Sequence, residues 1–471
     1  MSPSNSSPTS LNRPQGIYKW LTPLMLASAV LFSSHATTQA ASLNFSYAPG
    51  TSLNQIIGFE MAGGIWSRHL ADPVTVNLYV QTTNDLPSGV IGGALPGILP
   101  NQRYESWRNK LATDRTSAED QLAYKNQQND ADKFTALIDG YKIDNNYYLN
   151  MSRANAKAVG MLDLNHNGLD GAILMNTLAG QPVNWNYDFS GQVPINTLDF
   201  LSVALHETAH TLGFFSGVDQ PGWLIQKTNY DADHQSDFYA TLVGKLNNAT
   251  PLDMFRFSSQ SVQQAGSGDS WIDLSVGGNP YFSTDGGKTV LGQFTTGVDT
   301  TLGGDGNQAS HWKQQGNPLG IMDPTLVAGQ RRSLSALDLR AMDAIGWDLQ
   351  QLGIDLTVLQ QQAKEQLAQR LGVTVAWLDS NPEAAAALLT SDRTQDVEAM
   401  IEQSQIYNWR SGRGGGWWQG GLWQTSPVIV NSPSQVAAVP GPSLLPALLV
   451  GKGLLALRSL YKRRSKKHVR F

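Results

Sequence analysis

The chain has 471 residues, of which 41% are hydrophobic and 15% charged. This balance is ordinary for a folded protein with room for one large domain or two to three smaller ones. The formal net charge is -5 and the strongest cluster of Lys and Arg is confined to the extreme C-terminus, so we exclude a nucleic-acid-binding protein. The chain has no cysteine, which excludes disulfides, thiolate ligands and a cysteine-based latency switch. Any metal site must therefore use nitrogen and oxygen ligands.

Residues 1–40 are predicted to be a secretory signal peptide. Arg13 and Lys19 precede an apolar run at residues 20–32, and mostly small or polar residues follow it up to Ala40. The run is shorter than the roughly 20 residues that a transmembrane helix needs. We therefore expect cleavage after Ala40 and export of the mature chain.

Residues 42–196 show a mixed pattern of helices and strands. Helical spacing of apolar residues predicts helices at 56–70 and 150–162, and alternation or short apolar runs predict strands at 74–80 and 171–176. Between the last two elements, Asp163, Asn165, Asn167 and Asp170 place oxygen atoms before a glycine with the spacing of a calcium loop, although the bidentate Glu at the twelfth position is absent. The segment is therefore either a calcium site or a simple turn.

The segment 199–214, DFLSVALHETAHTLGF, predicts a helix that carries metal chemistry. His206 and His210 are four residues apart, so both imidazoles lie on one helix face and can bind one ion, whereas Glu207 points to the adjacent side. The surrounding residues are apolar and predict a buried helix, where polar groups are costly unless something binds them. Gly213 is expected to end the helix.

About 100 residues rich in Gly, Asp, Ser and Asn follow this helix. We expect a helical piece near 236–246, strands near 271–276 and 288–294, and a hairpin turn at 281–287. Three short motifs come next: Ser310-His311-Trp312, the predicted tight turn Gly320-Ile-Met-Asp-Pro324, and an amphipathic helix that begins near Ser333 or Ser335. The residues expected to face a core on that helix are Leu337, Leu339, Met342 and Ile345.

A catalytic zinc ion normally has three protein ligands, so a third residue must join the two histidines. In the compact pattern H-E-x-x-H-x-x-G-x-x-H the third ligand would fall at position 216, which is Ser216. A glutamate ligand is excluded nearby because the next Glu after Glu207 is Glu365. The remaining candidates are Asp219, His234 and His311. We favour His311 because it shortly precedes the turn that contains Met322.

The succession of H-E-T-A-H-T-L-G-F, a long insertion, S-H-W-K, I-M-D-P and a closing helix resembles the leishmanolysin branch of the metzincin peptidases. The resemblance covers mainly residues 199–216 and 308–347. It implies that His311 is the third zinc ligand and Met322 the Met-turn residue. It also implies an α+β, metzincin-like zincin domain at residues 41–350, with a twisted sheet, an active-site helix, an insertion at about 214–308, a Met-turn and a C-terminal helix. Leishmanolysins are cystine-rich and have a cysteine-bearing propeptide, so their latency mechanism does not carry over.

Residues 351–432 are predicted to form a mostly helical extension, with helices near 356–371 and 382–403, followed by a Gly/Trp-rich linker. Residues 433–471 contain Val439-Pro-Gly-Pro442, an apolar run and a basic tail, which predicts a membrane segment. This end resembles the PEP-CTERM sorting signal of Gram-negative bacteria, with Gly441 in place of the signature glutamate. The resemblance implies handling by an exosortase and a location at the cell surface or outside the cell. Because of Gly441, cleavage and a retained anchor both stay open.

These features together predict a secreted or cell-surface zinc-dependent endopeptidase that acts on proteins or peptides. Zinc held by His206, His210 and His311 would activate water, and Glu207 would be the general base. The alternative is a non-catalytic adhesion or matrix protein with a structural zinc site, although such sites usually have four protein ligands and need no neighbouring Glu. Hydrolysis of a non-peptide amide would use the same groups.

Overall fold

A computed structural model describes residues 40–87, 89–128, 132–219, 239–240, 242–244, 246 and 248–404, all within one compact unit, Thr38–Phe471. Outside the described residues lie the signal peptide expected at 1–40 (except residue 40 itself), His234, residues 236–238, 241 and 245 of the helix expected near 236–246, the Gly/Trp-rich linker and the C-terminal sorting signal. The helices within the described ranges are all too short or too polar to cross a membrane.

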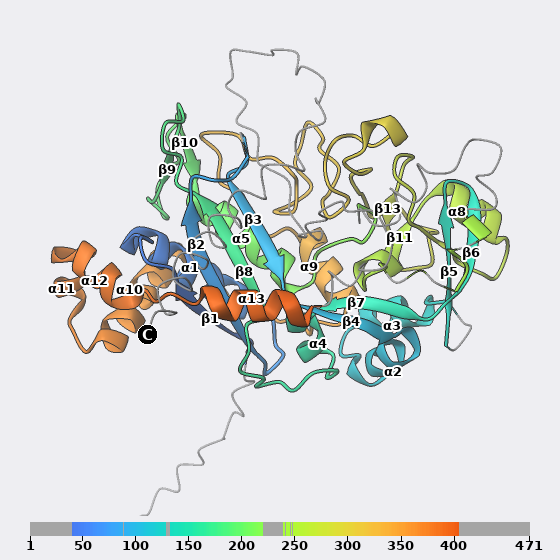
Figure 1. Ribbon diagram of the computed structural model, residues 1–471, viewed down its shortest axis with the longest axis horizontal. Helices are drawn as coiled ribbons and strands as arrows, with labels where there is room; N and C mark the ends of the chain where they lie inside the picture. The colour runs from blue at the N-terminus through green and yellow to red at the C-terminus, as the bar shows by residue number, and fades with distance from the viewer. Residues whose placement is uncertain are drawn as a thin grey trace, which may run out of the picture. The chain divides into compact units, whose positions relative to one another are not determined.

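The centre of the fold is a four-stranded mixed sheet (Figure 1). Its strands, in spatial order, are β1 (Ser42–Tyr47), β2 (Thr75–Thr83), β8 (Gly171–Asn176) and β3 (Gly92–Pro96). The first three are parallel, and β3 is an antiparallel edge strand. The two strands predicted at 74–80 and 171–176 are thus confirmed. Strand β3 was not predicted, because two glycines and a proline in five residues disfavour a strand and only edge positions tolerate the proline.

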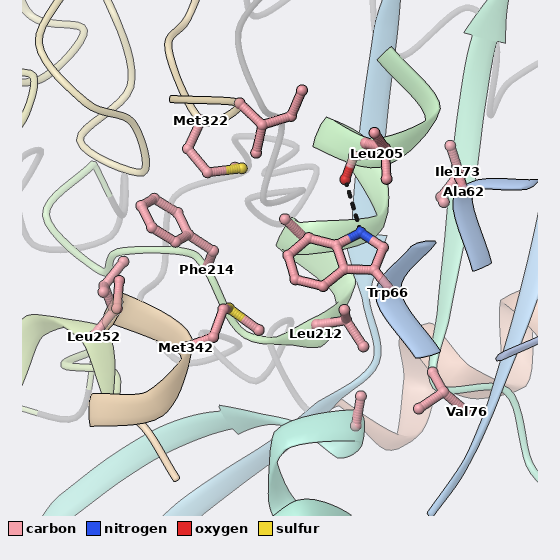
Figure 2. Close-up of a cluster of buried hydrophobic side chains, with 14 of the residues drawn as sticks. Ala62, Trp66, Val76, Ile173, Leu205, Leu212, Phe214, Leu252, Met322 and Met342 are labelled. Atoms are coloured by element: carbon pink, nitrogen blue, oxygen red, sulfur yellow. Dashed lines mark hydrogen bonds between the residues drawn. The ribbon is translucent and has the colours of Figure 1, made fainter. Parts of the chain in front are cut away.

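Two long helices cover one face of this sheet. Helix α1 (Leu53–Ser67) confirms the predicted helix at 56–70, and Ser52 and Gln55 cap its start with a reciprocal capping box. Helix α5 (Phe200–Leu212) is the predicted histidine helix and packs against α1 and β3. Trp66 joins the two helices, because its indole Nε1 donates a hydrogen bond to the carbonyl of Leu205 over 3.3 Å (Figure 2).

The opposite face of the sheet is covered by the end of the described chain. Met400 of helix α13 (Thr394–Gln403) packs on Tyr79 of β2 and Ala172 of β8, and α13 crosses in front of the sheet in Figure 1. Oγ of Ser404 accepts a hydrogen bond from the backbone N–H of Ile98. The helical extension therefore completes the same unit.

The other helices of the extension pack on the N-terminal part of the chain. Helix α10 (Leu356–Leu371) has the predicted bounds and contacts α1. The predicted helix 382–403 is divided into α12 (Pro382–Leu389) and α13, because Thr390 leaves the helix to form a β-bridge with Tyr47. The short helix α11 (Val375–Ser380) connects α10 and α12.

The chain between β3 and β8 forms a further group of strands and helices. It consists of β4 (Ile98–Arg103), α2 (Tyr104–Asp114), α3 (Ala118–Lys125), β5 (Phe134–Ile138), β6 (Tyr141–Asn146), β7 (Tyr148–Ser152) and α4 (Arg153–Ala158). The helix predicted at 150–162 is wrong at both ends, because residues 148–152 pair with β4 as a strand and the helix stops at Ala158. Ser152 then caps α4, which has only six residues.

The segment after the histidine helix consists mostly of short elements. These are η2 (Leu252–Phe255), β11 (Arg256–Phe257), α8 (Ser259–Ala265), β12 (Ile272–Asp273), β13 (Tyr281–Phe282), β14 (Gly292–Gln293) and η3 (Thr300–Leu302). Strands β13 and β14 are antiparallel, which confirms the hairpin expected around 281–287, and β12 pairs with β5. A small parallel pair, β9 (Asn184–Asn186) and β10 (Thr197–Asp199), leads into α5.

The closing helix α9 (Ala336–Ala344) begins at the expected position, with Ser335 as its N-cap. Of the residues expected to face a core, Met342 and Ile345 are buried, and Leu337 and Leu339 are half-buried against the same core.

Candidate metal centre

Helix α5, which carries the histidines, is fixed at both ends by specific hydrogen bonds. At its start, the carboxylate of Asp199 accepts from the backbone N–H of Ser202 and from the guanidinium of Arg331. At its end, Gly213 has a φ of 124°, a conformation that side-chain-bearing residues rarely adopt. The last carbonyls of a helix have no N–H donor within the helix. Here the indole N–H of Trp347 donates a hydrogen bond to the carbonyl of Leu212.

The structure brings His206, His210 and His311 together. Nε2 of His206 lies 3.0 Å from Nε2 of His210 and 3.2 Å from Nε2 of His311. Among the described residues, this is the only group of three or more His, Cys, Asp or Glu side chains whose ligand atoms all lie within 4.8 Å of one another. His311 is thus the residue that joins the two helical histidines from about a hundred positions away.

Backbone carbonyls determine which nitrogen of each imidazole faces the centre of the group. Nδ1 of His206 lies 2.7 Å from the carbonyl oxygen of Ile321, and Nδ1 of His210 lies 2.6 Å from that of Phe214. Nδ1 of His311 lies 3.0 Å from the carbonyl of Gln308. Because a carbonyl can only accept, each Nδ1 carries the hydrogen and each Nε2 of a neutral ring presents a lone pair.

The environment keeps these rings neutral. His210 and His311 are fully buried and His206 is 3% exposed. Burial lowers the pKa of His206 to about 4 and that of His311 to about 3, and burial together with the two neighbouring histidines lowers the pKa of His210 well below its usual value. Three buried lone pairs then converge on one point, an arrangement that a cation stabilises.

The spacing of the nitrogens fits a small tetrahedral ion. Bonds of about 2.05 Å at the tetrahedral angle separate two ligand nitrogens by roughly 3.3 Å. The observed separations of 3.0 and 3.2 Å are close to this value. The three histidines can therefore hold a metal ion through Nε2, with their Nδ1 hydrogen bonds acting as the outer contacts that orient the rings.

The turn around Met322 lies directly against the metal group. The preceding residue, Ile321, provides the carbonyl that orients His206, and the backbone N–H of Trp312 donates to the carbonyl of Met322 over 3.0 Å. The side chain of Met322 is 1% exposed and lies in the same apolar cluster as Phe214 and Leu205 (Figure 2). The turn is thus hydrogen-bonded to helix α5 through Ile321 and to the segment of His311 through Met322.

Asp338 of α9 holds this turn in place. Its buried carboxylate accepts hydrogen bonds from the backbone N–H groups of Ile321 and Met322 and from the indole of Trp312. Sequence reasoning missed this residue. The spacing Ser335-x-x-Asp338 is that of a capping box and identifies the start of α9, but it gives no indication that the same carboxylate reaches the turn.

The segment that contains His311 is hydrogen-bonded to the residues just beyond α5. The N–H of Ser216 donates to Oγ of Ser310 over 3.0 Å. The carboxylate of Asp219 accepts from the N–H groups of Val298 and Ala309, at 2.9 and 2.6 Å. Asp219, which the sequence left open as a ligand, therefore supports the loop that carries His311 and is not part of the metal group.

Glu207 lies on the side of α5 that faces the edge strand β3. It is fully buried. A Cβ atom built at Gly92 of β3 would lie 2.6 Å from Oε1 of Glu207, so the carboxylate directly abuts the backbone of the strand. The side chain of Glu207 thus occupies a confined position between helix and strand.

The loop expected to bind calcium is closed by a lysine. Nζ of Lys157 is fully buried and donates to Oδ2 of Asp170 over 2.6 Å and to the carbonyls of Thr75 and His166. Asp163 accepts from the N–H of Asn165 in a local turn, and Asn165 and Asn167 are exposed. Of the four predicted ligands, only Asp170 is buried, and its partner is an ammonium group. The described residues contain no carboxylate group of metal-binding geometry in this loop.

No protein-family model, curated protein or solved structure matches the chain.

Proposed function

We propose that the protein is a zinc-dependent endopeptidase of the metzincin type, related to the leishmanolysin branch. The observation that carries this proposal is the convergence of three buried Nε2 lone pairs from His206, His210 and His311, with Glu207 next to the first of them. Three nitrogen ligands leave a fourth position open, which is typical of catalytic and not of structural zinc. The Met322 turn and the closing helix α9 follow in the order that the resemblance implies.

Zinc bound at this site would lower the pKa of a water molecule and polarise a peptide carbonyl. Glu207 would take the proton of the attacking water and pass it to the leaving amine, as a general base and then a general acid. The three histidines would stay neutral, since burial lowers the pKa of each ring. The hydrogen bonds at Nδ1 would keep the rings oriented throughout.

We also propose that the protein is exported and acts at or beyond the surface of a Gram-negative-type cell. The apolar run near the N-terminus supports export, and the PEP-CTERM-like end supports sorting by an exosortase. Protein or peptide substrates follow from the endopeptidase proposal.

The test is the substitution Glu207→Gln in the purified protein. We expect the variant to bind one equivalent of zinc like the wild type, measured by elemental analysis, and to lose digestion of casein by about a hundredfold or more. Full digestion by the variant would contradict the proposal. A wild-type protein that contains zinc but cleaves nothing, with or without added metal, would favour the adhesion alternative.

A further inference from the structure

The glycine at position 92 stands where helix α5 meets the edge of the sheet. A Cβ atom at this position would lie 2.6 Å from Oε1 and 3.1 Å from Cδ of Glu207, and 2.9 Å from Cγ1 of Val203. Val203 and Glu207 are one helical turn apart, so the strand backbone fits into the groove between their side chains. Carbon and oxygen atoms in van der Waals contact are usually more than 3 Å apart, and any side chain at position 92 would displace the carboxylate or the strand.

The neighbouring residue, Gly93, has the opposite surroundings. A Cβ atom at Gly93 would meet nothing within 4 Å. Successive residues of a strand point to opposite faces of the sheet, so position 92 faces α5 and position 93 faces away from it. Neither glycine has a positive φ, so neither is required by its backbone conformation. The requirement for glycine at 92 is therefore one of space, and the atom that most restricts it belongs to Glu207.

We propose that Gly92 is a positioning residue for the general base: its bare Cα forms the wall that fixes the Glu207 carboxylate beside the metal group. This inference rests on the proposed function, since it assigns Glu207 the proton-transfer role. Strand β3 is itself fixed, because it pairs with β8 from Gly92↔Met175 to Pro96↔Gly171. The wall therefore cannot move away without breaking the edge of the central sheet.

The test compares Gly92→Ala with Gly93→Ala. Both changes add one methyl group to the same strand and reduce the freedom of the unfolded chain equally. We expect Gly92→Ala to lower kcat by roughly tenfold to hundredfold, because a misplacement of about 1 Å costs on that order. KM and zinc affinity, measured by competition with a coloured chelator, should stay at wild-type values. Gly93→Ala should match the wild type in all three.

Two further measurements separate positioning from general damage to the fold. The acid limb of the pH profile of kcat/KM reports the proton affinity of the base, and we expect it to shift in Gly92→Ala but not in Gly93→Ala. In a Glu207→Gln background, adding Gly92→Ala should cause no further loss, because the positioned group is already absent. An equal additional loss in that background would overturn the proposal.

The double variant Gly92→Ala/Val203→Ala covers the case in which Gly92→Ala does not fold. It removes the methyl group of Val203 that the new Cβ would meet at 2.9 Å, and it leaves the contact with Glu207. We expect a folded, zinc-binding protein whose kcat remains low. Suppose that Glu207→Gln is inactive, but that kcat of a folded Gly92→Ala, or of the double variant, stays within about twofold of that of Gly93→Ala. The positioning role of Gly92 is then wrong, and the peptidase proposal stands. An inactive wild type would instead remove the proposed function.

Discussion

The backbone N–H of Ser216 donates a hydrogen bond to Oγ of Ser310 over 3.0 Å. Ser216 occupies the position at which a compact metzincin would place its third histidine, and Ser310 directly precedes His311. This hydrogen bond therefore holds the segment of His311 against the end of helix α5, about a hundred residues along the chain from His210.

Replacing Ser310 with alanine tests this connection. The variant keeps His311 but leaves the buried N–H of Ser216 without its acceptor, which costs about 1–3 kcal/mol. We expect zinc affinity to fall roughly tenfold, in line with the loss of other contacts that orient metal ligands. Ser275→Ala is the matched control, because Oγ of Ser275 accepts from the N–H of Asp139 elsewhere in the fold. Equal zinc affinities in the two variants, measured by chelator competition, would refute the role of Ser310.

Asp338 should be essential to the turn beneath the metal group. In Asp338→Ala the N–H groups of Ile321 and Met322 and the indole of Trp312 lose a common acceptor. We expect the free energy of unfolding to fall by roughly 3 kcal/mol or more, because several buried donors are left unpaired. Urea denaturation with and without zinc measures this loss.

The control for Asp338 is Asp355→Ala, which removes the N-cap of α10 at an exposed position. A cap of this kind contributes about 1 kcal/mol. We expect zinc affinity to fall in Asp338→Ala and to remain unchanged in Asp355→Ala. A loss of stability in Asp338→Ala without any change in zinc affinity would show that the turn is not coupled to the ligands.

The sequence was sufficient for the groups that follow a short-range pattern. Helix α5 carries His206, Glu207 and His210 about one turn apart, and Ser335 caps α9. The two histidines with their glutamate, and the start of α9, were therefore predicted from local spacing alone. The pairing of His311 with this helix was supported by elimination and resemblance. Other residues support the site through contacts between distant segments, namely Asp338, Ser310 and Gly92. Residue type and spacing give no signal for such contacts.

The features that local sequence patterns did not determine also depend on contacts between distant segments. Strand β3 contains two glycines and a proline, and only its pairing with β8 makes it a strand. Of the two interpretations left open for the loop 163–171, a calcium site would need Asp170 as a free ligand, whereas its partner in the structure is Lys157, which lies one element earlier in the chain. A local pattern of oxygen atoms cannot reveal a cation that arrives from elsewhere in the fold.

We predict that the ammonium group of Lys157 occupies the place in the loop 163–171 that a calcium ion would otherwise take, so that the loop binds no calcium. We expect the melting temperature of the wild type to be the same in excess calcium and in a calcium-selective chelator. Lys157→Met should destabilise the protein by about 3–5 kcal/mol, because it leaves the buried carboxylate of Asp170 uncompensated. The double variant Lys157→Met/Asp170→Asn should recover part of the loss. A calcium-dependent rise in the melting temperature of the wild type would contradict this expectation and support a calcium site.

Asp72 should make the stability of the protein depend on pH. Burial raises its pKa to about 8, and the nearby carboxylates of Asp348 and Asp114 add to the shift. One oxygen of Asp72 accepts from the N–H of Asp348, a bond that an asparagine can also make. Because the folded state holds the proton more tightly than the unfolded chain, this group favours folding below its ordinary pKa near 4, and that contribution disappears as the pH rises to about 8.

Asp72→Asn removes this dependence, since an amide does not ionise. We expect the variant to melt several degrees above the wild type at pH 8 and to gain much less at pH 5, measured by calorimetry in both buffers. Asp85→Asn makes the same substitution at an exposed position and should alter neither value. A gain that is equal at the two pH values would mean that Asp72 is ionised in the folded protein throughout this range. The buried carboxylate would then have a cationic partner that offsets Asp348 and Asp114.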